Sequence, residues 1–491
     1  MMTTKGVPIW GRLFLSYMLF SLQAMSATNP QLNIIVVMGD DHGQWAMGTY
    51  GDQNIETPNL DWLAEQGVLF ENAISPAPVC SPARASFHTG KLPSQHGVHD
   101  FLAENIDFDS NWLEGETLLS ERLSNLGYRN GLFGKWHATT NSKIPQRGFD
   151  RWLSYDPYRS GWENQYNHSG RVTFSDDGDE LDFSGTQAWY LTSEAIRFID
   201  EDSEKPFFIS LNFTEPHFPF EGLPERLVKK YRLVANKIVS AGGNSDFVSR
   251  GAHTRTPLEH IEQLSQYLAA VNLIDEQMGR IIDALSGRGI LDNTLLVYTA
   301  DHGLLVGQYG LYGKTNATAI PNFYDETIKI PLIISGPNAM VRGSQRRDEF
   351  VDLIDLHTTI LDYASNGSLS ISSYGPGVSL RPLLYGERET NWRIYQTAER
   401  GQARMIMDGR WKLVRMYQRE FNKLPVDYWF DLSHPFGEKH SIKWVPESHK
   451  KVLIDYLEDY FSNYEDPQKS GRKIWHQPMP NPRMLEDLLA N

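Results

Sequence analysis

Two pairs of residues with metal-binding side chains follow apolar runs in this chain. Asp40 and Asp41 directly follow one such run, and Asp301 and His302 directly follow another. Paired carboxylates at the end of a strand can hold a hard divalent cation such as calcium or magnesium, which prefers oxygen ligands. Each pair alone fits a solvated turn better than a metal site. Two such pairs at strand ends of one sheet favour a shared cation site.

The one cysteine of the chain, Cys80, is a candidate nucleophile. A single cysteine excludes a disulfide framework and a thiolate metal cluster. Cys80 precedes Pro82, where we expect a helix to begin, and the dipole of that helix would favour the thiolate. The alternative is a buried structural thiol.

Basic and imidazole side chains occur in several segments with loop-like sequence. They are Lys135, His137, His217 and Lys314. Each one alone fits a surface lysine or a core histidine better than a functional group. Together with Arg84 they would form a cationic pocket in a chain whose formal net charge is −15. Such a pocket would suit a tetrahedral oxyanion.

The composition excludes several classes of protein. Hydrophobic residues make up 40% of the 491 residues and charged residues 22%, which are globular proportions, so a disordered or fibrous protein is excluded. The negative net charge repels nucleic acid, and no basic stripe in the sequence offsets that repulsion. We therefore expect no nucleic-acid partner.

Alternating apolar runs and amphipathic segments predict an α/β fold. Its core would be a large, mostly parallel (mixed) sheet between two layers of helices, with the active site beyond the carboxyl ends of the strands. The expected strands are 33–38, 129–133, 206–213, 294–299 and 330–335. The expected helices are 81–89, 117–126, 186–199, 261–285 and 351–363.

The pattern changes near Asn391 to shorter runs joined by turns such as Asp408-Gly409. It predicts a smaller α+β subdomain built on an antiparallel sheet, with a helix at 450–464. The expected division of the chain is a signal peptide at 1–26, a catalytic domain at 27–390 and this C-terminal subdomain at 391–491.

The N-terminus has the three parts of a secretory signal peptide. Lys5 and Arg12 are basic, 13–22 is a short apolar run, and Ala24-Met25-Ser26 is a small-residue cleavage site. We expect an exported protein, periplasmic or secreted. No later segment has 18 continuous apolar residues, so no stable membrane insertion is expected after the signal is cleaved.

The segment 151–184 is aromatic, acidic and rich in glycine, and we expect it to be a long surface insertion. Its aromatic rings could stack on sugar faces, while Arg151 or Arg159 could meet acidic groups. Ordinary loop packing is the alternative for the same residues. The rings in question are Trp152, Tyr155, Tyr158, Trp162 and Tyr166.

The segment from Cys80 to Arg84, Cys-x-Pro-x-Arg followed by Thr-Gly, closely resembles the motif of type I, formylglycine-dependent sulfatases of the alkaline phosphatase superfamily. Five elements occur in the order of that family: Asp40-Asp41, Cys80 to Arg84, Lys135 with His137, His217, and Asp301-His302 with Lys314. The segment 428–432 resembles the closing segment of the family. The Asp-His pair and its short spacing to Lys314 resemble the polysaccharide- or iduronate-type branch. The resemblance implies an alkaline-phosphatase-like fold.

The resemblance also implies a modified residue and a metal ion. Cys80 would be oxidised to formylglycine (3-oxoalanine) by a formylglycine-generating or sulfatase-maturating enzyme. One calcium ion would be bound by Asp40, Asp41, Asp301 and His302, with an oxygen of the modified Cys80.

Roles for the other site residues follow from the same resemblance. Lys135, His217 and Lys314 would bind the sulfate of the substrate. Arg84 would hold the hydrate of the aldehyde, and His137 would contact its second hydroxyl. His217 or Lys314 is our candidate for protonating the leaving oxygen.

The implied activity is that of a sulfuric ester hydrolase. We expect its substrate to be a sulfated oligo- or polysaccharide, either an algal one such as carrageenan, ulvan or fucan, or a glycosaminoglycan. The alternatives are an aryl or alkyl sulfatase, a phosphonate or phosphate ester hydrolase of the same superfamily, and a non-catalytic binder of sulfated glycans.

Overall fold

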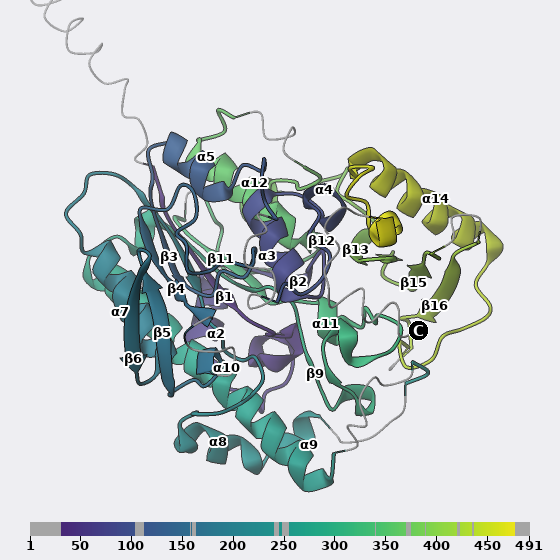
Figure 1. Cartoon of the computed structure of the whole chain (residues 1–491), viewed down its shortest axis with the longest axis horizontal. Coiled ribbons are helices and arrows are strands. Elements are labelled where there is room, and N and C mark those ends of the chain that lie inside the picture. The colour runs from purple at the N-terminus through teal and green to yellow at the C-terminus, as the bar shows by residue number, and fades with distance from the viewer. Residues whose placement is uncertain are drawn as a thin grey trace, which may run out of the picture.

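The computed structural model describes most of the chain after residue 30. The described residues are 31–103, 112–157, 159, 164–239, 245–247, 255–338, 340–369, 375–387, 389–419, 423–434 and 437–476. The expected signal peptide therefore lies outside the described residues. Figure 1 shows a large sheet between helices, with a second, smaller sheet beside it near the C-terminus.

The main sheet has ten strands in the described part of the chain. In spatial order they are β12 (Gln345–Asp352), β2 (Val68–Ile74), β11 (Leu332–Ser335), β8 (Thr294–Ala300), β1 (Asn33–Gly39), β7 (Phe207–Asn212), β3 (Arg129–Gly134), β4 (Arg151–Tyr155), β5 (Arg171–Asp176) and β6 (Asp179–Ser184).

The centre of this sheet is parallel and part of its remainder is antiparallel, as expected for a mixed sheet. The strands β8, β1, β7, β3 and β4 all run in one direction. β11 is antiparallel to both of its neighbours, and β5 and β6 are antiparallel to the strands beside them. The segment 151–184 is therefore not only a surface insertion, because its strands β4, β5 and β6 extend the sheet to one edge.

Helices cover both faces of the main sheet (Figure 1). One layer contains α2 (Pro58–Gln66), α7 (Gln187–Ile199) and α10 (Pro257–Gly287), and the other contains α3 (Cys80–Thr89), α5 (Leu119–Asn125) and α12 (Leu353–Ala364). The side chain of Thr256 caps α10 by accepting from the backbone N–H of Glu259, in a capping box. The shorter helices are α4 (Pro93–His96), α8 (Glu225–Arg232), α9 (Ala235–Ile238), α11 (Asp325–Ile328) and α13 (Arg381–Leu384).

The apolar run of β1 is buried along its whole length, as its unbroken hydrophobic sequence predicts. Ile35 and Val37 pack into the core formed with α2, α7 and α10. Ile34 and Val36 face the opposite way, into the core formed with α3, α5 and α12. Alternate side chains thus anchor the strand to both helical layers, which fixes the position of its carboxyl end.

The smaller sheet is antiparallel. It contains β13 (Gln396–Arg400), β14 (Ala403–Met407), β15 (Trp411–Met416) and β16 (Val426–Asp431) in sequence order. α14 (Glu447–Tyr464) packs on one face through Leu453, Leu457 and Phe461. This arrangement matches the predicted C-terminal α+β architecture.

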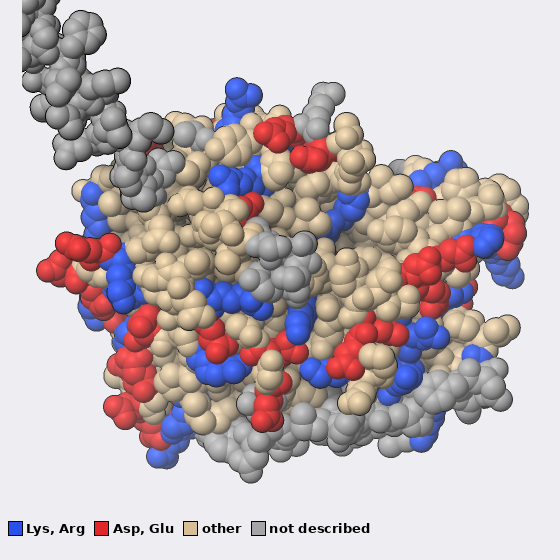
Figure 2. Space-filling view, turned by 90° about the horizontal axis from the view of Figure 1, so that it is seen from above, with Lys and Arg blue, Asp and Glu red and all other residues tan. Residues whose placement is uncertain are grey.

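The surface carries charges of both signs. On the face shown in Figure 2, Lys and Arg are interspersed with Asp and Glu, without a continuous basic band among the coloured residues. Within the described ranges, every helix is too short or too polar to cross a membrane.

Candidate active site

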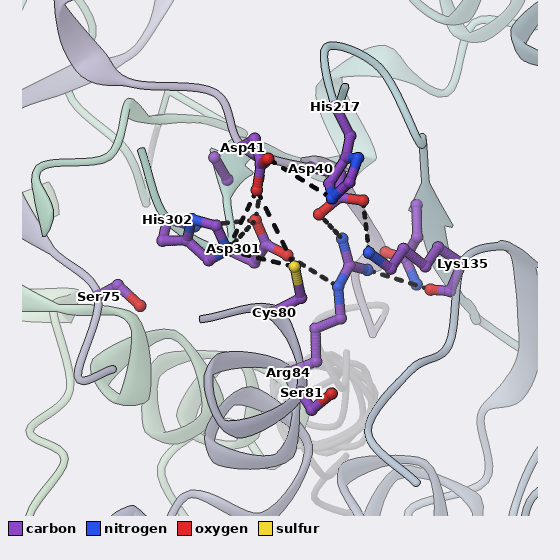
Figure 3. Close-up of polar contacts among 12 residues, drawn as sticks. Asp40, Asp41, Ser75, Cys80, Ser81, Arg84, Lys135, His217, Asp301 and His302 are labelled. Atoms are coloured by element: carbon purple, nitrogen blue, oxygen red, sulfur yellow. Dashed lines mark hydrogen bonds and ion pairs between the residues drawn. The ribbon is translucent and has the colours of Figure 1, made fainter. Parts of the chain in front are cut away.

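The predicted site residues converge at the carboxyl ends of four adjacent parallel strands. Asp40 follows β1, Lys135 follows β3, His217 follows β7, and Asp301 follows β8. Because parallel strands end at the same edge of a sheet, residues far apart in sequence meet there. Figure 3 shows their side chains pointing toward one another around Cys80.

The turn after β1 is held by a tyrosine from α10. Asp41 has a φ of 69°, a left-handed conformation that Asp tolerates better than most residues. The hydroxyl of Tyr267 donates to the carbonyl of Asp41 at 2.9 Å and accepts the N–H of Gly43 at 3.0 Å. Tyr267 is fully buried, so these two bonds fix the turn that presents the Asp41 carboxylate.

Cys80 is the first residue of α3, and Arg84 lies one turn further along the helix. The guanidinium of Arg84 is almost completely buried. Its Nε donates to Asp301 Oδ2 at 2.9 Å, and its Nη1 donates to the carbonyl of Lys135 at 3.1 Å. Arg84 therefore connects the helix that carries Cys80 to the ends of β8 and β3.

The thiol of Cys80 lies among cationic groups. Lys314 Nζ is 2.9 Å from Cys80 Sγ, and His302 Nε2 is 3.3 Å from it. Burial would raise the pKa of this thiol, but the ammonium groups of Lys135 and Lys314 outweigh burial and hold the pKa well below its usual range. The pocket thus stabilises a negative charge at the position of Cys80.

The acidic residues form a cluster that fits a hard cation. Ligand atoms of Asp40, Cys80, Asp301 and His302 all lie within 4.8 Å of one another, and a second such group contains Asp40, Asp41, Cys80 and His217. Asp40 Oδ1 is buried without a hydrogen-bond partner among the described residues. Arg84 Nη2 lies 3.6 Å from this oxygen, in an ion pair. A carboxylate oxygen without a hydrogen bond in a cluster of carboxylates is the donor chemistry that calcium or magnesium requires.

The titration of these acidic groups reflects a balance between burial and nearby cations. Burial raises the pKa of Asp40, but Lys135 and other cations overcome burial and hold that pKa well below its usual value. The pKa of Asp301 is raised to about 6, because burial outweighs the opposing effect of Arg84. Burial lowers the pKa of His302, but the negative charges of Asp301, Cys80 and Asp41 together more than compensate and raise it to about 9.

His137 and His217 bind backbone carbonyls through different ring nitrogens. His137 has a φ of 50°, and its Nε2–H donates to the carbonyl of Leu102 at 2.9 Å. Since Nε2 is engaged there, Nδ1 is the nitrogen left for the site. His217 instead donates its Nδ1–H to the carbonyl of Phe218, and its Nε2 lies 3.6 Å from Asp41 Oδ2.

Sequence reasoning missed the groups that hold this site in place. Tyr267, the carbonyl of Leu102 and the hydroxyl of Ser81, which accepts the N–H of Leu102 at 3.0 Å, carry no local signal of such a role. Tyr166, expected among sugar-facing rings, stacks on the imidazole of His217 at 4.1 Å between ring centres.

The other described residues of 151–184 that are candidates for sugar binding have other contacts. Trp152 and Tyr155 are each only 1% exposed, so their rings are core residues, while Tyr158 and Trp162 lie outside the described residues. The two arginines form ion pairs with acidic residues of the same segment: Arg151 with Asp176 and Asp177, and Arg159 with Glu180.

Comparisons with known proteins identify the family of this chain. The family model described as Sulfatase matches residues 32–366. An arylsulfatase of Clostridium perfringens is 28% identical over 74% of this chain and 80% of its own length. An N-acetylglucosamine-6-O-sulfatase of Bacteroides thetaiotaomicron is 27% identical over 91% of this chain and 90% of its own length.

A solved structure has the same fold. It shows a protein in complex with its substrate, D-glucosamine-2-N,6-O-disulfate, and superimposes with a TM-score of 0.73 at 23% identity, over 88% of this chain and 98% of that one. The family match covers the whole main sheet and each motif from Asp40 to Lys314. The chain therefore belongs to the alkaline-phosphatase-like sulfatase family and is a sulfuric ester hydrolase.

Proposed function

We propose that the protein removes sulfate from sulfated carbohydrates, using a formylglycine made from Cys80 and one bound calcium ion. The observation that carries this proposal is the position of Cys80, whose sulfur lies between the carboxylate cluster and the ammonium group of Lys314. A thiol at that position is next to both a cation site and a pocket for an anion.

The proposed calcium ligands are Asp40, Asp41, Asp301 and His302, with an oxygen of the modified Cys80. The ion supplies positive charge that neutralises sulfate oxygens as charge develops on them. The formylglycine supplies, as its hydrate, a hydroxyl nucleophile and a second hydroxyl through which the aldehyde is regenerated. Arg84 holds Asp301 in place and would also hold the hydrate.

The sulfate itself would be bound by Lys135, His217 and Lys314. Burial disfavours the ammonium form of Lys314, but the charges of Asp41, Cys80 and Asp40 together outweigh burial and raise the pKa of the lysine, so Lys314 remains a cation at neutral pH. Fixed cations in a water-poor pocket stabilise charge that develops on sulfate oxygens more strongly than water does. His137 Nδ1 is placed to accept a proton, and His217 or Lys314 to protonate the leaving oxygen.

The proposed substrate is a sulfated oligo- or polysaccharide. Support comes from the similarity over nine-tenths of the chain to a relative named for sulfated N-acetylglucosamine, and from the shared fold of a protein solved with a disulfated glucosamine. Carrageenan, ulvan, fucan and glycosaminoglycans are the candidate polymers. A formylglycine-generating or sulfatase-maturating enzyme would be a transient partner.

The proposal includes export and a two-part chain. We infer that residues 1–26 direct export to the periplasm or the medium and are then cleaved. The catalytic domain would comprise 27–390 and the C-terminal subdomain 391–491, which contains the separate antiparallel sheet.

The mass of the Cys80 peptide tests this proposal. Protein made together with a maturation enzyme should show a loss of roughly 18 Da at Cys80, because sulfur and two hydrogens are replaced by one oxygen. The converted protein should release sulfate from at least one member of a panel of sulfated glycans, and Cys80→Ala should release none. A thiol that persists under competent maturation would contradict the formylglycine mechanism, and faster release from aryl phosphate than from any sulfate ester would point to a phosphoesterase.

A further inference from the structure

His217 is held by an aromatic ring that comes from a distant segment of the chain. The ring of Tyr166 stacks on its imidazole at 4.1 Å between centres, with 19° between the ring planes. The ammonium of Lys135 lies 5.2 Å from the centre of the same tyrosine ring. Tyr166 is only 4% exposed, so its ring is a wall of the site and not a surface platform.

A second contact joins the same two segments behind that wall. His168, two residues after Tyr166, places its Nδ1 3.1 Å from Oε1 of Glu215, two residues before His217. Both side chains are completely buried, and their nitrogen and oxygen atoms have no hydrogen-bond partner among the described residues, so the contact is a close polar approach without hydrogen-bond geometry. The contact holds two buried polar groups against each other, and each offsets part of the cost of burying the other.

The segment that carries Tyr166 and His168 is itself fixed in place. Gln187, at the start of α7, donates its side-chain amide to the carbonyls of Asn164 and Asn167, and its backbone N–H to the carbonyl of His168. The N–H of His168 donates in turn to the carbonyl of Glu221 at 3.1 Å. These hydrogen bonds anchor the backbone on both sides of Tyr166, and they therefore fix the position from which its ring reaches His217.

The Glu215 side of the contact is equally constrained. The carbonyl of Glu215 accepts the N–H of Asp40 at 2.9 Å, which ties the residue to the end of β1. His217 follows this anchored residue by two positions. Its Nδ1–H donates to the carbonyl of Phe218, and its Nε2 faces Asp41 in the site. The stacked ring of Tyr166, the carbonyl of Phe218 and the anchored backbone at Glu215 therefore set the orientation of the imidazole.

We propose that Tyr166 and the His168–Glu215 pair are positioning residues that fix the imidazole of His217 against the sulfate ester. This inference rests on the proposed function, in which His217 contacts the sulfate. The pair locks the two segments together, and the ring of Tyr166 stops the imidazole from rotating away from the substrate. A displacement of about 1 Å at a reacting group can reduce the rate about 100-fold.

A double-mutant cycle tests the role of Tyr166. With Tyr166→Leu we expect kcat/KM for a sulfated sugar to fall at least about 10-fold, while Tyr166→Phe, which keeps the stacking ring, stays within about 3-fold of the wild type. In a His217→Asn background Tyr166→Leu should have little further effect, because a residue that acts through another loses its effect when the other is removed. If the two single-variant losses, expressed as activation free energies, simply add in the double variant, the proposal is wrong.

The second contact has its own matched variants. His168→Asn keeps a donor near the position of Nδ1 and should retain most of the wild-type kcat/KM. For His168→Leu, we expect kcat/KM to fall by about as much as it does for Tyr166→Leu. Melting temperatures of all variants are measured together. Equal losses for the Asn and Leu variants, or a loss that follows the melting temperature, would assign His168 a structural role alone.

Binding of inorganic sulfate separates this inference from the proposed function. Calorimetry on the unconverted protein should show weaker sulfate binding for Tyr166→Leu than for Tyr166→Phe. A converted wild-type protein that hydrolyses no sulfate ester would contradict the proposed function, while the sulfate-binding comparison would still test the positioning. An active enzyme in which Tyr166→Leu alters neither sulfate binding nor kcat/KM would contradict only this inference.

Discussion

Arg84 Nε lies 2.9 Å from Asp301 Oδ2, although the two residues are 217 positions apart in the sequence. Both side chains are almost completely buried. The contact joins the helix that begins at Cys80 to the end of β8, so the position of the candidate nucleophile depends on an ion pair that the sheet topology creates. Removing one partner would leave a charge in a medium that cannot solvate it.

Replacement of Arg84 should therefore affect both stability and activity. We expect Arg84→Gln to lower the free energy of unfolding by about 3–5 kcal/mol, since Asp301 keeps its burial without its cation. Sulfate release should fall at least about 100-fold. Denaturant unfolding and kcat/KM are the measurements, with the mass of the Cys80 peptide recorded to separate catalysis from maturation.

A partly buried pair near α12 provides the control. Arg393 donates to the fully buried Asp355 at 2.5 Å, near the start of α12. Arg393→Gln should destabilise the protein without lowering kcat in the folded fraction. If Arg393→Gln and Arg84→Gln reduce kcat equally, stability alone explains the effect of Arg84.

Removal of the metal should abolish activity and lower the melting temperature. A ligand that binds only the folded state stabilises it by about 2.7 kcal/mol at 100 times its Kd. Calcium should therefore raise the melting temperature of chelator-treated protein, and Asp41→Asn should remove most of that increase. Asp202→Asn, at an exposed surface position, is the control. An unchanged response to calcium in Asp41→Asn would exclude Asp41 as a ligand.

The hydroxyl of Tyr267 should contribute to both stability and catalysis. Tyr267→Phe removes the acceptor of the Gly43 N–H and the donor to the Asp41 carbonyl, which leaves two buried polar groups without partners. We expect a loss of about 1–3 kcal/mol in the free energy of unfolding, with a weaker response to calcium. Tyr464→Phe, at an exposed position on α14, should change neither quantity. A neutral Tyr267→Phe would show that the Asp41 turn holds without this bond.

Asp275 should make stability depend on pH below neutrality. Burial raises its pKa to about 6, despite hydrogen bonds from the N–H groups of Asn59 and Leu60. An unfolded aspartate has a pKa of about 3.9, so the folded state binds more protons between about pH 4 and 6. The ionisable group of Asp275 therefore stabilises the folded state at a pH below this interval, and this stabilisation is lost as the pH rises through the interval. The loss in the free energy of unfolding is on the order of 2–3 kcal/mol.

The neutral variant isolates this effect. Asp275→Asn keeps an oxygen that can accept from α2 but cannot ionise, so it should become more stable relative to the wild type as the pH rises from about 4 to 7. Asp283→Asn, at an exposed position on the same helix, should show no such trend. Denaturant midpoints across this pH range are the measurement. Parallel curves for the wild type and Asp275→Asn would contradict the prediction.

The fold class could be predicted from the sequence because its signals are local. The run in β1 is apolar without alternation, and polar residues begin at its end, so both its burial and the position of Asp40 follow from the sequence. The direction of β11 and the addition of β4 to β6 at the sheet edge could not be predicted. Strand direction and edge pairing depend on hydrogen bonds between distant segments, which leave no local pattern.

The sequence by itself determined which residue types are available for the chemistry: carboxylates at strand ends, one cysteine at a helix start, and separate lysines and histidines. The tertiary structure alone decided their environment. Lys314 meets Cys80, Tyr166 faces His217 instead of a sugar, and Asp40 and Asp301 have opposite pKa shifts in one pocket. Burial and distance set the strength of each charge interaction, and both quantities exist only once the chain has folded.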